Sequence, residues 1–287
     1  MLDLLAAQPG LHIAVVFILG LLVGSFLNVV ILRLPVMLDH AWRTDAAMIL
    51  EQPAPADQPP GIAGPASACP TCGQRIRAWQ NVPVLSYLLL RGRCANCRAP
   101  ISLQYPLVEL ASGLLAATVA WQFGVTFPAL LALIYTWMLL ALTGIDWRTQ
   151  FLPDLLTLPL LWLGLLASLG GAFAHPADAI VGAAAGYGAL WLVFQAFRLT
   201  TGKEGMGYGD FKLLAAIGAW LGWQALPLVV ILASVAGAVA GLAMMASGRL
   251  QRGNPMPFGP FLAIAGWLAL VAGDTITRAY FQLAGLG

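Results

Sequence analysis

Long apolar runs separated by short polar connections make up most of the chain. Runs bounded by charge, Pro or Gly occur at about 11–33, 104–123, 128–145, 153–173, 178–198, 209–223, 225–247 and 258–278. A bilayer core of about 30 Å is crossed by about 20 predominantly apolar residues in a helix. The pattern therefore predicts an all-α polytopic membrane protein with about eight transmembrane helices, of which the run at 209–223 is the shortest.

The only long polar segment lies between the first two runs and divides the chain into three parts. We expect a first transmembrane helix at 1–33, a cytoplasmic loop at 34–103 and a seven-helix membrane domain at 104–287. Within the loop, residues 51–67 contain five Pro and two Gly, a composition typical of an extended linker. The remainder of the loop predicts a small folded module.

Composition supports a membrane protein and limits its partners. Hydrophobic residues make up 60% of the chain and charged residues 9%, whereas soluble domains carry roughly 25% charged residues. The formal net charge is only +2, which provides no basic field for nucleic acid, so membrane lipid is the expected surroundings and nucleic acid is not an expected partner. No basic residue precedes the first run, so we expect it to remain as a membrane helix rather than to be a cleaved signal peptide.

The basic residues predict the orientation of the helices. Thirteen of the 14 Lys and Arg residues fall in alternate connections of an eight-helix threading, and only Arg278 falls on the other side. The positive-inside rule makes the side with the thirteen residues cytoplasmic. Both termini are then expected on the periplasmic side.

Four cysteines form two C-x-x-C pairs that predict a zinc site. Cys69 and Cys72 lie in CPTC, Cys94 and Cys97 lie in CANC, and 21 residues separate the two pairs. Each pair can direct two thiolates at one ion, and two pairs complete a tetrahedral, zinc-ribbon-like site. Two disulfides or four free thiols are the alternatives, but a cytoplasmic location disfavours disulfides. Four thiolates leave no position for water, so the zinc is expected to be structural.

Two aspartates at the cytoplasmic ends of predicted helices are candidate catalytic residues. Asp146 ends the third run, and Asp210 opens the sixth run in the motif GMGYGD. Two carboxylates that share a site do not both ionise easily, so one can activate water while the other donates a proton, as in aspartic peptidases. Gly207 and Gly209 would let the backbone adopt strained angles and approach a substrate. The alternatives are helix capping for Asp210 and an ordinary loop carboxylate for Asp146.

Other polar residues near the predicted helices have less specific interpretations. Asp154 follows a proline at a helix start and is expected to be an N-cap. Glu109 lies within the second run, where it would pair with an Arg or contact substrate, and Asn28 is expected to form an interhelical hydrogen bond. Asp178 and Asp274 are expected to be solvated or capping. The three histidines have no Ser or carboxylate at a useful spacing, so the sequence does not support a Ser or His catalytic site.

Together these motifs resemble the bacterial type IV prepilin peptidases, an A24 aspartic peptidase family. The resemblance is carried by both cysteine pairs and by segments at 24–35, 81–94, 101–110, 145–166, 201–224 and 257–263, including GSFLNVVILRLP, IDWRTQFLPD and GMGYGDFK. It implies a bifunctional inner-membrane enzyme that removes the leader of type IV prepilins and type II secretion pseudopilins at the cytoplasmic face. It also implies N-methylation of the new N-terminal residue.

The resemblance also assigns residues and cofactors. It implies that Asp146 and Asp210 are the catalytic pair and that the four cysteines bind zinc. It further implies S-adenosylmethionine as the methyl donor, but the chain has no recognisable nucleotide-binding motif, so the sequence assigns no residues to this cofactor. The chain departs from many relatives at about 36–68, where Pro-rich, acidic sequence replaces basic residues.

Three other functions share part of this pattern. A different G-x-G-D intramembrane aspartic protease would use the same pair of aspartates but would have no need of the cysteine module. A transporter or membrane scaffold would relay ions or protons through its aspartates and dock a partner on the zinc module, yet the charges cluster at one membrane face. The third alternative is a peptidase without methyl transfer, and archaeal-type relatives of that kind lack the cysteine module.

Overall fold

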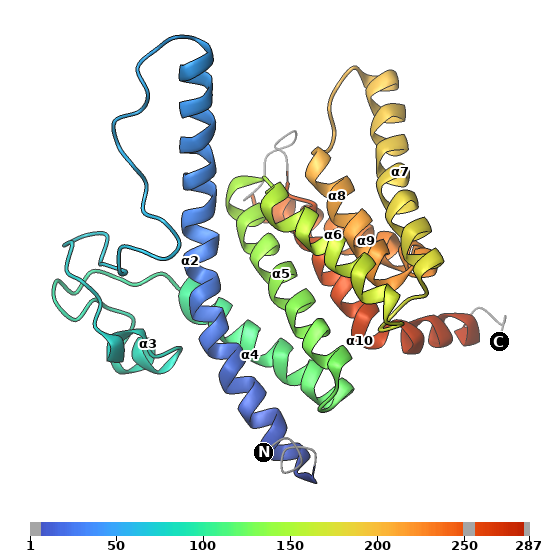
Figure 1. Ribbon diagram of the computed structural model, residues 1–287, viewed down its shortest axis with the longest axis horizontal. Helices are drawn as coiled ribbons and strands as arrows, with labels where there is room; N and C mark the ends of the chain where they lie inside the picture. Colours follow the sequence, from blue (N-terminus) through green and yellow to red (C-terminus); the bar gives the residue numbers. More distant parts are fainter. Residues whose placement is uncertain (1–6, 249–255, 284–287) are drawn as a thin grey trace. The chain divides into compact units, whose positions relative to one another are not determined.

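The computed structural model describes residues 7–248 and 256–283, in which all regular elements are helical. Two isolated antiparallel bridges, one in each cysteine knuckle, are the only β pairing among these residues. The helices are α2 (Pro9–Ile49), η1 (Ala78–Asn81), α3 (Leu85–Leu89), α4 (Gln104–Phe123), α5 (Phe127–Thr149), α6 (Asp154–Leu169), α7 (Pro176–Thr201), α8 (Tyr208–Leu221), η2 (Trp223–Ala225), α9 (Leu226–Ala246) and α10 (Gly259–Leu283). They form two compact units, residues 1–129 and 130–287 (Figure 1).

Every predicted apolar run lies on a helix, but not every helix is long enough to cross a bilayer. Six described helices have the length and hydropathy of a membrane span: α2, α4, α5, α7, the segment Trp223–Ala246, and α10. α6 has 16 residues and α8 has 14. The structure therefore confirms an all-α, multi-pass architecture, but it does not confirm the count of eight spans.

The first helix continues beyond the predicted transmembrane segment. That segment is expected to end at residue 33, whereas α2 continues through Pro35 to Ile49. Arg33 marks the end of the apolar run, but charge does not end a helix, and half of the residues that follow are the good helix formers Ala, Leu, Met and Arg. An ion pair of 2.9 Å between Arg43 and Asp39, one turn apart, lies on this extension. Residues 51–67, expected to be a linker, contain no helix or strand.

In the first unit, small residues bring α2 and α4 into close contact. Gly20 and Gly24 form a G-x-x-x-G pattern on α2, and a Cβ at Gly24 would lie 2.7 Å from the Cα of Glu109 on α4. The hydroxyl of Ser112 donates a 2.6 Å hydrogen bond to the carbonyl of Gly20. One turn beyond, the amide of Asn28 donates to the carbonyl of Tyr105 at 3.1 Å. This contact confirms the interhelical hydrogen bond predicted for Asn28.

In the second unit, α8 is the most buried helix, and it packs against α6, α7 and α10 (Figure 1). Ten of its 14 residues are buried. A helix that is apolar on all sides is stable when protein surrounds it, which explains why so short an apolar run is helical. Trp220 anchors it by donating a 2.7 Å hydrogen bond to the carbonyl of Leu160 on α6. The burial of α8 fixes the position of its first turn, which contains Asp210.

Candidate active site and metal centre

Asp146 lies in the last turns of α5, in the second unit, with only 4% of its surface exposed. The backbone amide of Gly259, the first residue of α10, donates a hydrogen bond to its carboxylate. Its Oδ2 has no hydrogen-bond partner among the described residues. The start of α10 therefore offers the positive end of a helix dipole to this carboxylate, while one oxygen stays available for chemistry.

Asp210 lies in the first turn of α8 and is 8% exposed. Its carboxylate accepts a hydrogen bond from the amide of Gly207, the N-cap residue of the same helix. The negative charge of Asp146 also acts on it, so the two carboxylates lie close enough to repel each other. Both aspartates that the sequence singled out are thus buried and form one electrostatically coupled pair. Ionising both carboxylates at once would be energetically costly.

The glycines of the G-x-G-D motif do not have strained backbone angles, and the one at Gly209 matters because it has no side chain. Gly207 has ordinary extended dihedral angles, with φ −84° and ψ 150°, and Gly209 is not among the residues with positive φ. The expectation of strained angles at these glycines was therefore wrong. A Cβ at Gly209 would instead lie 2.7 Å from the Cβ of Leu152, so glycine lets the loop before α6 pack against the start of α8. A Cβ at Gly207 would contact only the backbone nitrogen of Gly209, at 4.0 Å.

Asp154 does not cap its helix, contrary to the prediction. Pro153 is the N-cap of α6, and Asp154 is the first helical residue. Its carboxylate forms an ion pair with Lys212 on α8, with distances of 2.6 and 2.8 Å from Nζ to its two oxygens. The Asp154 side chain is 54% exposed. Asp154 thus joins α6 to α8 near the aspartate pair, and an exposed ion pair satisfies its charge.

The four cysteines of the first unit lie in two knuckles with matching backbone hydrogen bonds. The amide of Cys69 donates to the carbonyl of Gln74, and the amide of Cys94 donates to the carbonyl of Ala99, at 2.9 and 2.8 Å. Gly73 in the first knuckle and Arg98 in the second occupy the equivalent left-handed position, with φ of 68° and 61°. The ligand-forming turns are therefore two copies of one local structure.

The sulfur atoms are arranged as a metal site requires. One ligand atom from each cysteine lies within 4.8 Å of the other three, and no disulfide joins them. This set fits the tetrahedral zinc–thiolate geometry, whose Zn–S distance is about 2.3 Å. Arg75, Arg77, Arg91 and Arg93 lie between the knuckles in the sequence and supply positive charge to the module.

The thiols of the knuckles differ in acidity. Hydrogen bonds from the backbone amides of Cys72 and Thr71 lower the pKa of Cys69 to about 6. The amide of Ala99 lowers the pKa of Cys97, but partial desolvation and the neighbouring thiols outweigh it and raise this pKa to about 11. Four thiolates crowded together thus need a cation to share their charge.

Glu109 has a partner that the sequence did not reveal. It is 8% exposed on α4, and its Oε2 accepts a 2.8 Å hydrogen bond from the backbone amide of Val84. The hydroxyl of Ser25 on α2 also donates to it. Val84 has a left-handed backbone, with φ 60°, so the carboxylate holds an unusual turn just before α3. These partners replace the Arg that the sequence analysis considered.

The remaining aspartates have local roles. Asp178 lies in the first turn of α7 and accepts a 2.9 Å hydrogen bond from the indole of Trp223. Asp274 is exposed on α10, as predicted. His175 is the N-cap of α7, and its Nδ1 accepts from the amide of Ala177 at 3.3 Å. Arg249 and Arg252, which the prediction of orientation used, lie outside the described residues.

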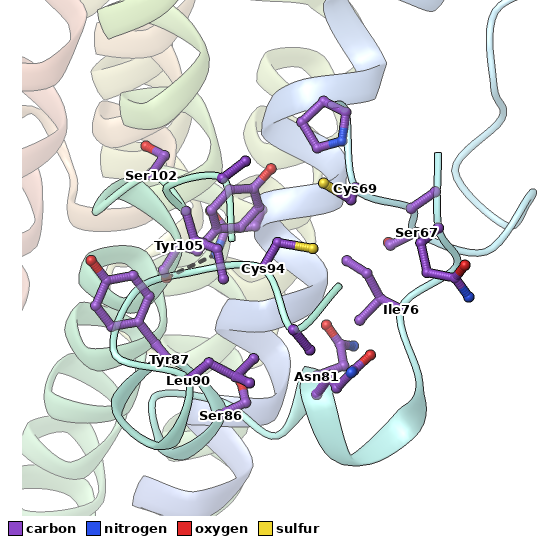
Figure 2. A pocket seen from close by; sticks show the side chains of 18 of the residues that line it. Ser67, Cys69, Ile76, Asn81, Ser86, Tyr87, Leu90, Cys94, Ser102 and Tyr105 are labelled. Atoms are coloured by element: carbon purple, nitrogen blue, oxygen red, sulfur yellow. Dashed lines mark hydrogen bonds between the residues drawn. The ribbon is translucent and has the colours of Figure 1, made fainter. Parts of the chain in front are cut away.

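The first unit contains a cavity of about 450 Å³ that the sequence analysis did not predict. Its walls come from α2, α3, the start of α4 and both knuckles. Figure 2 shows the side chains of Cys69 and Cys94 at its knuckle side and Tyr105, from α4, at its helix side. Because the walls include residues as far apart in the sequence as Ser25 and Glu109, no local motif could have indicated it.

Comparison with known proteins gives a consistent result over the whole chain. Residues 18–123 match the model of the bacterial peptidase A24 N-terminal domain, and residues 133–242 match that of the type IV leader peptidase family. A prepilin leader peptidase/N-methyltransferase of Pseudomonas aeruginosa is 54% identical over 286 residues, covering 99% of both chains. Similarly named proteins of Stutzerimonas stutzeri and Burkholderia pseudomallei are 54% and 52% identical, covering 99% and 98% of this chain. No solved structure matches the chain.

Proposed function

The chain belongs to the type IV leader peptidase family, and on this premise we propose that it is a bifunctional membrane enzyme that cleaves prepilin leaders and N-methylates the product. The full-length identity to proteins named prepilin leader peptidase/N-methyltransferase supports both activities. The observation that carries the peptidase proposal is the buried, coupled pair of Asp146 and Asp210. Its substrates would be type IV prepilins and type II secretion pseudopilins.

The aspartate pair can perform peptide hydrolysis without a metal. One carboxylate is ionised and takes a proton from a water molecule, whose oxygen attacks the scissile carbonyl carbon. The other is protonated and donates to the carbonyl oxygen, which gives a tetrahedral intermediate. When this intermediate collapses, the C–N bond breaks and the new amine leaves with a proton. The amides of Gly259 and Gly207 hold the two carboxylates in place throughout.

The freed N-terminal amine is then the methyl acceptor. S-adenosylmethionine, as the proposed donor, supplies an electrophilic methyl group on a sulfonium sulfur when it is bound. The full-length match to relatives named N-methyltransferases, including an N-terminal domain with both cysteine pairs, argues against a peptidase that lacks methyl transfer. The same full-length match gives no support to a transporter or to an unrelated G-x-G-D protease.

Zinc on the four cysteines is proposed as a structural cofactor. The described chain offers four sulfur ligands and no further His, Asp or Glu in the cluster, a donor set that is typical of closed structural sites. Bound zinc would fix the two knuckles to each other. Because the knuckles form one side of the 450 Å³ cavity, the metal would also shape that cavity.

A location in the bacterial inner membrane follows from the proposed substrates and from the apolar helices. A prepilin has a cationic leader followed by an apolar helix, so its cleavage junction would lie at the cytoplasmic surface. Asp146 and Asp210 lie near the cytoplasmic ends of their helices in the proposed orientation. We therefore propose that both the aspartate pair and the zinc module face the cytoplasm, with both termini on the periplasmic side.

The decisive experiment compares cleavage of a purified prepilin by the wild type, Asp146→Asn and Asp210→Asn in liposomes. Asparagine keeps the size and polarity of aspartate but cannot exchange the proton, so each variant should lose cleavage by at least about a thousandfold. Asp274→Asn, on the exposed surface of α10, is the matched control and should cleave normally. Methylation of a pre-cut prepilin should persist in both dyad variants. Normal cleavage by either of them would refute the assignment.

A further inference from the structure

The cavity in the first unit is a built site rather than a surface depression. Its volume of about 450 Å³ falls in the range of about 300–1,000 Å³ typical of pockets for small ligands. α2 and α4 form one side, and they are held together by the contacts at Gly20, Gly24 and Asn28. The cysteine knuckles form another side. The walls are thus fixed by helix packing on one side and by the proposed zinc on the other.

A buried, unpartnered acceptor lines this cavity. Asn28 is 2% exposed, and its Nδ2 donates to the carbonyl oxygens of Tyr105 and Gly24. Its Oδ1 has no hydrogen-bond partner among the described residues. A buried polar atom without a partner is uncommon in native proteins and calls for a specific explanation. A ligand that presents an N–H group would satisfy it.

The charges at the cavity fit a ligand that is cationic at one part and anionic at another. Glu109 supplies a carboxylate, and the described residues include no cationic side chain that pairs with it. Arg33 also lines the cavity, with one guanidinium nitrogen held by the carbonyl of Gly61 at 2.7 Å. Its remaining N–H groups can bind a carboxylate. Tyr87 and Tyr105 add aromatic surface for a planar base or a cation.

We propose that this cavity is the binding site of the methyl donor, with Asn28 and Glu109 as its buried polar contacts. The inference rests on the proposed methyltransferase function and assigns residues to it. S-adenosylmethionine combines the features that the walls require: an adenine amino group for the free Oδ1 of Asn28, and positively charged sulfonium and ammonium groups for Glu109. Its carboxylate group matches Arg33.

Two other occupants fit the walls less well. A lipid acyl chain offers no N–H group to Asn28 and no positive charge to Glu109. The N-terminal residue of a cleaved prepilin carries an amine, but it has neither an adenine nor a free carboxylate, so it would leave Arg33 without an anion.

Methyl transfer at this site needs no reactant other than the methyl donor and the substrate amine. The lone pair of the unprotonated amine forms a bond to the methyl carbon as the carbon–sulfur bond breaks. The electron pair of that bond returns to sulfur, which becomes a neutral thioether. The methylated amine then releases one proton to solvent.

The test measures binding of S-adenosylmethionine and of S-adenosylhomocysteine to the purified, zinc-loaded full chain by titration calorimetry. Glu109→Gln keeps an oxygen for the Val84 amide but removes the negative charge, and it should weaken S-adenosylmethionine binding at least tenfold. Asn28→Leu removes the free acceptor and should weaken both ligands by a similar factor. Asp39→Asn, an exposed carboxylate on α2 outside the cavity, is the matched control and should bind like the wild type. Zinc content and thermal unfolding of each variant report whether it is folded.

The outcomes separate this inference from the proposed function. Wild-type methylation with unchanged ligand binding in a folded Glu109→Gln variant would overturn the site and leave the function intact. Absence of both binding and methylation in the wild type would overturn the proposed function itself. A photoreactive S-adenosylmethionine analogue should label residues 25–33 or 67–109, which line the cavity, and labelling confined to residues 130–287 would also overturn the site. Displacement of the analogue by lipid or by pre-cut prepilin, but not by S-adenosylhomocysteine, would identify one of the other occupants instead.

Discussion

The amide of Gly259 donates a hydrogen bond to the carboxylate of Asp146, and a Cβ at Gly259 would lie only 2.6 Å from Oδ2 of that carboxylate. A glycine at the first residue of α10 therefore lets the helix end approach the carboxylate closely. The hydrogen bond and the short approach involve the same carboxylate, although Oδ2 itself has no hydrogen-bond partner among the described residues. Any side chain at this position has to displace either the helix or the aspartate.

Gly259→Ala should therefore lower prepilin cleavage at least tenfold. The added methyl group would push the Asp146 carboxylate out of register with Asp210, and small displacements of reacting groups have large effects on rate. Initial rates of cleavage in liposomes measure this effect. Gly273→Ala, in the same helix with no atom within 4 Å of the added Cβ, is the control and should retain activity. Equal rates for the two variants would mean that the contact at Gly259 does not position Asp146.

The ion pair between Asp154 and Lys212 predicts a structural rather than a catalytic role for Asp154. Because the pair is largely exposed, it should contribute at most about 1 kcal/mol to stability. Asp154→Asn should then keep cleavage within about fivefold of the wild type and lower the melting temperature by only a few degrees. Cleavage assays and thermal unfolding, run beside Asp210→Asn, measure both effects. A loss of cleavage as large as that of Asp210→Asn would instead make Asp154 a member of the catalytic group.

Apolar periodicity and short motifs predicted much of this architecture. The eight apolar runs all became helices, and Asp146 and Asp210, which are 64 positions apart in the sequence, did become one coupled pair. α2 continues to Ile49, beyond the predicted end of the transmembrane segment at Arg33, because the end of an apolar run does not by itself end a helix. The partner of Glu109 could not be predicted. It is the backbone amide of Val84, and every residue except proline has such an amide, so the sequence does not indicate which one is used. The cavity needs the packing of distant segments, which no local pattern encodes.

Zinc binding to the cysteine module should strengthen as pH rises. The metal binds thiolates, so each thiol that is protonated in the free site must release its proton on binding. The pKa of Cys69, lowered to about 6, means that this thiol is already ionised above neutral pH and releases little. The pKa of Cys97, raised to about 11, means that it still releases a proton between pH 7 and pH 8. Zinc affinity should therefore rise by about tenfold or more per pH unit in this window.

Competition with a metal chelator at pH 6.5, 7.0, 7.5 and 8.0 measures this dependence on the purified chain. Cys97→Ser, which removes the thiol whose pKa is raised, should bind zinc more weakly and with a shallower pH dependence. Removal of zinc from the wild type should lower its melting temperature and should abolish the binding of S-adenosylhomocysteine. A zinc affinity independent of pH would contradict a thiolate site.

The packing of α7 on α8 predicts which glycines stabilise the second unit. Cβ atoms added at Gly182 on α7 or at Gly218 on α8 would each overlap the carbonyl oxygen of the other residue. Gly182→Ala should force the two helices apart and lower stability by about 1–3 kcal/mol. Gly188→Ala, on the same helix with nothing within 4 Å of the new Cβ, should be neutral or slightly stabilising because alanine favours the helix. Thermal unfolding of the two variants in one detergent distinguishes these results. Because α8 carries Asp210, Gly182→Ala should also reduce cleavage, and unchanged stability together with unchanged cleavage would show that the close approach of α7 and α8 is not needed.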